Sequence, residues 1–150
     1  VLNTNTNARN VSATGASFTQ ETGWSTWTID FPVAGLLICD FAALLTIQTA
    51  NAFVAYTPKV VGSSDCTLTE MGNNSGQLRF AGGTSTNYAR ATARQVWEVT
   101  AVGSGGGIAE FAHYTAKTAS ATATILGPEC LFQFIPFGSP RYKRITVSEA

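Results

Sequence analysis

Hydrophobic residues recur mainly at every second position of this chain, which is the period of a β-strand with one buried face. Trp27, Ile29 and Phe31 alternate with polar residues, and the stretch 88–102 alternates in the same way. No stretch shows a clear helical period, and segments rich in Gly, Pro, Ser or Asn separate the apolar ones. The pattern predicts an all-β protein with about eight strands. We place them at 16–20, 24–31, 36–48, 52–61, 88–102, 108–115, 119–125 and 130–137, with short extended pieces at 66–70 and 77–80 and a short strand or tail at 141–147.

Two of these strands are apolar on both faces. In 36–48, one face carries Leu37, Cys39, Phe41, Ala43, Leu45 and Ile47, and the other carries Leu36, Ile38, Asp40, Ala42 and Leu44. A buried helix is the alternative interpretation of this stretch. The segment 130–137 is also apolar on both faces and follows a strand that Gly127 and Pro128 are expected to end. A single sandwich buries one face of each sheet, so the second face is expected to pack against other copies in a closed homo-oligomer. The interface residues predicted on this basis are Phe132, Phe134, Leu36 and Ile38.

The number of strands and turns is typical of an antiparallel two-sheet sandwich or jelly roll. With 150 residues and a mass of 15.8 kDa the chain is long enough for one domain with its own core. We expect residues 1–15, which are rich in Asn and Thr, to form an extended polar arm, and residues 16–150 to form a single jelly-roll domain.

Charge narrows the range of partners. The chain has 9 basic and 9 acidic residues, a formal net charge of zero and only 12% charged residues, so neither nucleic acid nor an anionic membrane is an expected partner. The longest apolar stretch, about a dozen residues long, is too short to span a bilayer, which takes about 20. Basic residues are concentrated only at Arg141, Lys143 and Arg144, around Tyr142.

Residues that could carry catalysis or hold a cofactor are sparse. His113 is the only histidine, and Cys39, Cys66 and Cys130 lie far apart along the chain without the spacing of a zinc site. We therefore expect no enzyme, no metal and no cofactor, with His113 hydrogen-bonded inside a sheet or an interface. The thiols are expected to be mostly buried, and a disulfide between two of them stays open. The loop 103–107, with four glycines, is interpreted as a hairpin turn, and Trp24 and Trp27 are expected on opposite faces of one strand.

The order of these features resembles a known fold family. Phe31-Pro32-Val33-Ala34-Gly35-Leu36-Leu37 opens a long apolar strand, residues 88–102 lead through Gly-rich turns, and Leu131-Phe132-Gln133-Phe134 closes the domain. This order resembles the jelly roll of the tumour necrosis factor and complement globular-head superfamily over about residues 24–137. The chain departs from that pattern in having no Tyr after Gly35 and no Gly-Asp turn before a late strand. Similar jelly rolls occur in tailed-phage virion proteins, both as head decoration proteins and as tail tips.

The resemblance implies a homotrimer with a binding or cementing role and no catalytic residue. A short chain without a heptad or Gly-x-y shaft, in which Val1 is expected to follow a removed initiator Met, favours a capsid decoration (cement) protein on the outer surface of the virion. Its partner would be the major capsid protein or another virion protein, contacted through Arg141, Tyr142, Lys143, Arg144, Arg9 and Asn10. The alternative is a module that binds a receptor or a host-surface glycan through loops 62–87. Such a module would be a phage tail tip or a secreted, extracellular lectin domain like a complement head.

Overall fold

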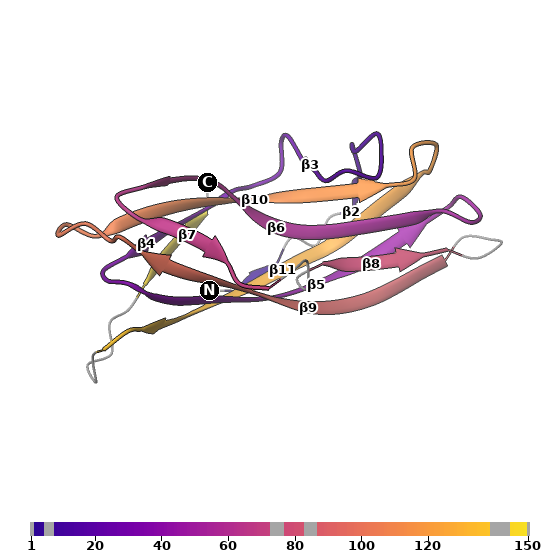
Figure 1. The fold of residues 1–150 in the computed structure, drawn as a ribbon. Helices are drawn as coiled ribbons and strands as arrows, with labels where there is room; N and C mark the ends of the chain where they lie inside the picture. Colours follow the sequence, from indigo (N-terminus) through magenta and orange to yellow (C-terminus); the bar gives the residue numbers. More distant parts are fainter. Residues whose placement is uncertain (1, 5–7, 73–76, 83–86, 139–144, 150) are drawn as a thin grey trace.

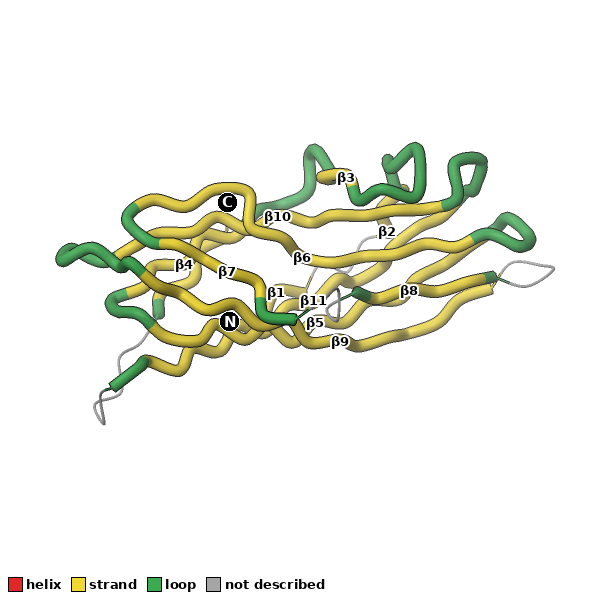
Figure 2. The backbone as a smooth tube through the Cα atoms, viewed as in Figure 1, coloured by secondary structure: helices red, strands yellow, loops and turns green. Residues whose placement is uncertain are grey.

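The computed structural model describes residues 2–4, 8–72, 77–82, 87–138 and 145–149. These residues form two antiparallel β-sheets packed face to face, with no helix, as Figures 1 and 2 show. The prediction of an all-β sandwich is therefore confirmed, and a buried helix at 36–48 was the wrong alternative. The strand order is β1-β11-β5-β9-β7 in sheet A, where β2 also pairs with β11, and β12-β4-β10-β6-β8 in sheet B, where β3 also pairs with β10.

The strands are more numerous than expected because short edge segments add to the long central ones. Sheet A contains β1 (Leu2–Thr4), β2 (Ala8–Asn10), β5 (Gly35–Ile47), β7 (Thr67–Glu70), β9 (Asn87–Thr100) and β11 (Ala123–Pro136). Sheet B contains β3 (Thr19–Gln20), β4 (Trp27–Phe31), β6 (Phe53–Ser64), β8 (Leu78–Ala81), β10 (Gly107–Lys117) and β12 (Thr146–Glu149). The long strands agree with the predicted ranges to within a few residues. The predicted strand at 16–20 shrinks to two residues.

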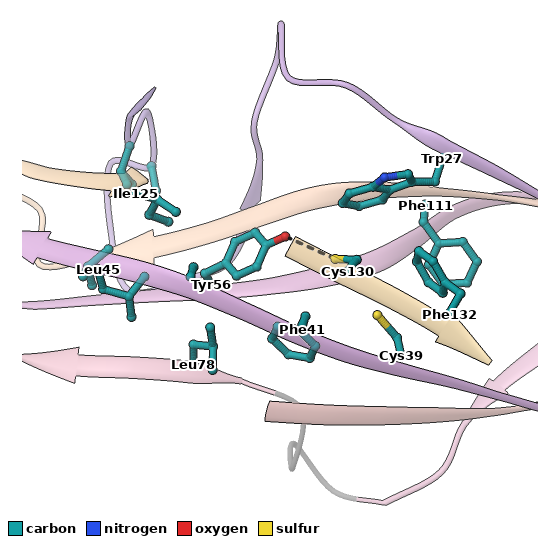
Figure 3. Close-up of a cluster of buried hydrophobic side chains, with 14 of the residues drawn as sticks. Trp27, Cys39, Phe41, Leu45, Tyr56, Leu78, Phe111, Ile125, Cys130 and Phe132 are labelled. Atoms are coloured by element: carbon teal, nitrogen blue, oxygen red, sulfur yellow. Dashed lines mark hydrogen bonds between the residues drawn. The ribbon is translucent and has the colours of Figure 1, made fainter. Parts of the chain in front are cut away.

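The core lies between the two sheets and is rich in aromatic rings. From β5, the face with Leu37, Cys39 and Phe41 is buried, as its alternation predicts, while the intervening residues are partly exposed. On sheet B, Phe111 of β10 packs its ring on those of Trp97 and Phe132 from sheet A, with centroids 5.0 and 5.4 Å apart. Figure 3 shows side chains from both sheets meeting in this layer. Aromatic contacts across the layer thus join the two sheets.

One strand, β11, replaces the two that were expected at 119–125 and 130–137. Its pairing with β5 shifts register between Leu126 and Glu129, which marks a β-bulge at Gly127 and Pro128 rather than a strand end. Beyond the bulge, Phe132 and Phe134 face the interior, where Phe132 joins the buried core and the ring of Phe134 lies 5.5 Å from that of Phe31. The apolar side chains that point outward from β11 are instead Leu131 and Ile135.

The N-terminal segment belongs to the sandwich. β1 and β2 both pair with β11, and Val11 and Ala13 are buried in the core. The chain then crosses to sheet B, where the buried carboxylate of Glu21 accepts hydrogen bonds from the Ser12 amide (2.9 Å), the Ser12 hydroxyl (2.6 Å) and the Thr115 hydroxyl. The Glu21 carboxylate thus links Ser12, in the segment that follows β2, to Thr115 of β10.

We predict that Gly35→Ala lowers the free energy of unfolding by about 1–3 kcal/mol, the usual cost of overpacking. A Cβ at Gly35 would collide with the carbonyl oxygen of Ile135 and would lie 2.6 Å from Cζ of Phe134. The strands β5 and β11 would have to move apart, and urea unfolding followed by Trp fluorescence measures the loss.

Gly62→Ala is the matched control, because a Cβ at this position of β6 meets nothing within 4 Å. It is expected to leave stability unchanged or to raise it by up to about 1 kcal/mol, since Gly in a strand costs conformational entropy. Equal losses in the two variants would contradict the close approach at Gly35.

Candidate functional site

The outer face of sheet A combines exposed apolar side chains with a hollow. The register places Leu36 of β5 between Ile135 of β11 and Glu98 of β9, and Ile38 between Gln133 and Val96. The predicted interface residues Leu36 and Ile38 thus do lie on this face, half-buried. Large apolar side chains remain exposed beside them: 38% of Leu131 and 51% of Ile135. Exposed apolar groups gathered on one sheet face are typical of protein-binding surfaces.

A hollow of about 530 Å³ opens in the middle of this face. Its floor consists of the small residues Ala42 and Thr92, which pair across β5 and β9, and its rim consists of longer side chains. The rim residues are Asp40, Arg94, Glu129 and Leu131. The hollow therefore arises because two short side chains lie among longer neighbours on adjacent strands.

Two ion pairs border the hollow. The Arg94 guanidinium donates two hydrogen bonds to the Asp40 carboxylate, at 2.6 and 2.9 Å, and Arg90 donates one to Glu129 at 3.3 Å. The bonds from Arg94 hold the pKa of Asp40 below its usual value and raise the pKa of Arg94 itself. All four side chains keep solvent exposure, so these pairs add little to stability and leave hydrogen-bonding capacity for a partner.

The outer face of sheet B differs, because residues of the same chain cover part of it. Ala112 and Ala116 point outward from β10 and are nevertheless buried. Beside them the Lys59 ammonium lies 5.0 Å from the ring centre of Phe18 and 5.6 Å from that of Tyr114. Sheet A thus has the more open apolar face.

The predicted partner-binding residues fall in different places. Arg9 pairs with Ile125 at the sheet edge, donates a hydrogen bond to the Gly23 carbonyl and lies over the Trp24 ring. Asn10 is exposed and pairs with Thr124. Arg141, Tyr142, Lys143 and Arg144 lie outside the described residues, so the structure does not test their role.

His113 lies in the core, where it is 2% exposed. Its Nδ1 is 2.8 Å from the Tyr56 hydroxyl, which is 3.7 Å from the Cys130 sulfur. Burial, with a smaller contribution from the Arg9 charge, lowers the pKa of His113 to about 3. The Tyr56 hydroxyl thus shares one hydrogen bond with the neutral imidazole ring and another with the Cys130 thiol. Figure 3 shows the Tyr56 and Cys130 pair between the sheets, with Cys39 beside it.

The two tryptophans that were expected on opposite faces both contact this histidine. The ring centroids of Trp24 and Trp27 lie 5.0 and 4.3 Å from that of His113. The expectation was wrong because β4 begins only at Trp27, so Trp24 lies in the preceding loop and follows no strand alternation. All three cysteines are free thiols, with Cys39 and Cys130 buried and Cys66 half-buried.

A second, more polar cavity of about 670 Å³ lies at one end of the sandwich. The loop Gly103–Gly107, Asp30 and Asp65 line it. This loop is not a hairpin within one sheet, because it carries the chain from β9 in sheet A to β10 in sheet B. Among the described residues, no three His, Cys, Asp or Glu side chains are grouped so that they could hold a metal ion.

No protein-family model matches the chain, and no curated protein matches it either. The described part of the chain also contains no helix with the length and hydrophobicity of a membrane span.

Proposed function

We propose that this protein is a non-enzymatic virion protein of a tailed phage: a jelly-roll homotrimer that decorates the outer surface of the head by binding the major capsid protein. The observation that carries the proposal is the outer face of sheet A, where Leu131 and Ile135 are exposed and where Leu131 lines a hollow bordered by ion pairs. An apolar centre with polar groups around it is the composition of a protein-binding surface.

The sequence resemblance supplies the virion context. The segment Phe31–Leu37 and the closing strand around Phe132 resemble jelly rolls that serve as head decoration proteins, and in the structure these segments are neighbours in one sandwich. Two faces are then required, one for other copies of the chain and one for the capsid. We assign the capsid contact to the basic cluster Arg141, Lys143 and Arg144, which follows the end of β11.

Co-sedimentation with phage heads tests this function. Heads are assembled from the major capsid protein encoded in the same genome and are mixed with the purified protein. Saturable binding is expected, and a variant with Arg141, Lys143 and Arg144 changed to Ala should bind at least about 10-fold more weakly, as for the loss of several charged contacts. Substitution is preferred to deletion of residues 1–10, since that deletion removes β1 and β2 from sheet A.

Absence of saturable binding to heads would overturn the proposal. Unchanged affinity of the triple variant would overturn the assignment of the basic cluster. Specific binding on a glycan array, lost when residues in loops 62–87 are changed, would replace the decoration function with the receptor-binding alternative.

A further inference from the structure

Charges around the hollow are sorted by strand. The bases Arg90 and Arg94 are on β9, whereas the acids are on the other two strands, Asp40 on β5 and Glu129 on β11. β9 also carries one acid on this face, Glu98. It pairs with Leu36 near the end of β9, away from the hollow. One side of the hollow is therefore basic and the other acidic, so the face is complementary to a second copy of itself.

The shape of this face is also complementary to that of a second copy. Leu131 projects from β11 with 38% of its surface exposed, and the floor of the hollow, Ala42 and Thr92, lies towards β9. A protruding leucine and a depression thus lie side by side on adjacent parts of one surface. If the β11 side of one copy meets the β9 side of another, the leucine fills the depression and the acids approach the bases.

We infer that the occupant of this face is another copy of this chain, with Leu131 of one copy inserted over Ala42 and Thr92 of the next and Glu129 bonded to Arg90 or Arg94 of the next. The Arg90 side chain donates one hydrogen bond within its own chain and is 66% exposed, so it has donors to spare for a neighbour. This inference rests on the homotrimer of the proposed function and names the surface through which the copies meet.

The mass of the protein in solution, measured by size-exclusion chromatography with light scattering, tests the contact. Leu131→Asp is expected to weaken self-association by about 30-fold or more, the effect of removing a central hot-spot residue. Ile108→Asp is the matched control, because Ile108 is 45% exposed on a strand of the opposite sheet. Both variants should keep the cooperative thermal unfolding of a folded sandwich.

Disulfide trapping identifies the neighbours directly. In a Cys66→Ser background, Thr92→Cys and Leu131→Cys are combined and oxidised with diamide. Within one chain these positions lie on strands that flank β5, about 10 Å apart at the usual strand spacing, too far for an intrachain disulfide, whose Cα atoms lie within about 7 Å. Covalent trimers on a non-reducing gel are the expected result, and either single variant should give none.

The outcomes separate this inference from the proposed function. A wild-type chain that is monomeric at all concentrations, or equal association of the Leu131→Asp and Ile108→Asp variants, overturns the inference even if the protein binds heads. Covalent dimers in place of trimers support the contact between copies and overturn the homotrimer. Trimers that form through Leu131 and bind no heads support the inference and overturn the decoration function.

Discussion

Acidification from pH 6.5 to 4.5 is expected to lower the free energy of unfolding by about 2–3 kcal/mol through His113 alone. The slope reaches at most about 1.4 kcal/mol per pH unit. The folded chain keeps His113 neutral, since burial lowers the pKa of this residue to about 3. In the unfolded chain the same imidazole binds a proton below its ordinary pKa of about 6.5. The unfolded state therefore gains protons as the pH falls, and the stability that is present above pH 6.5 is lost progressively towards pH 3.

Urea unfolding at a series of pH values measures this slope in the wild type and in His113→Gln. His113 is the only histidine of the chain, so the variant removes the titrating group while an amide at that position can still hydrogen-bond with the Tyr56 hydroxyl. The variant is expected to be less stable at pH 7 but nearly flat between pH 6.5 and 4.5. Parallel slopes in the two proteins would show that carboxylates, and not His113, cause the acid sensitivity.

Phe111→Ala is expected to lower the free energy of unfolding by about 3–5 kcal/mol, the cost of removing a fully buried aromatic side chain. Phe111 is completely buried, and its ring contacts Trp97 and Phe132 of the opposite sheet. Truncation leaves a cavity in the layer that joins the two sheets, and the rings of the other sheet cannot move to fill it without breaking strand pairing. The shift of the urea midpoint at pH 7 gives the loss.

Ile108→Ala is the control for the same strand. Ile108 lies three residues earlier on β10 and is 45% exposed, so its truncation is expected to cost at most about 0.5 kcal/mol. If the two variants lost similar stability, the aromatic contact across the layer would not be what holds the sheets together. Phe111→Leu should lie between the two.

The alternation of β5 was predictable because a strand in a sandwich repeats one simple rule over many residues. Leu37, Cys39 and Phe41 are buried, and Leu36 and Ile38 face outward, as the sequence pattern indicates. The pattern of β11 was not predictable in the same way. Gly and Pro usually end a strand, but here Gly127 has a φ of 56° and Pro128 needs no hydrogen-bond partner for its nitrogen. Both suit a bulge inside a continuing strand.

The candidate site was predicted in part. Leu36 and Ile38 were identified because they are apolar on the second face of a strand, whereas Phe132 and Phe134 were placed on the wrong face. Where a strand is apolar on both faces, the size of its side chains does not indicate which alternate residues face the core. The pairing register of β11 with β5 determines this. The pairs of Arg94 with Asp40 and of Arg90 with Glu129 join residues far apart in the sequence. Opposite charges on different strands were the available signal, but only the pairing register brings them together on one face of sheet A.

The pairing of the chain ends has a consequence for how the protein is made. β1 and β2 need β11 as their partner, and β12 pairs with β4. Sheet A is incomplete until β11 has left the ribosome and sheet B until β12 has, so the sandwich closes through contacts of high sequence separation. Such a topology folds slowly, in milliseconds to seconds. During that time one edge of the apolar strand β5 lacks its partner β11, and synthesis rate or chaperone supply is expected to control the yield of folded protein.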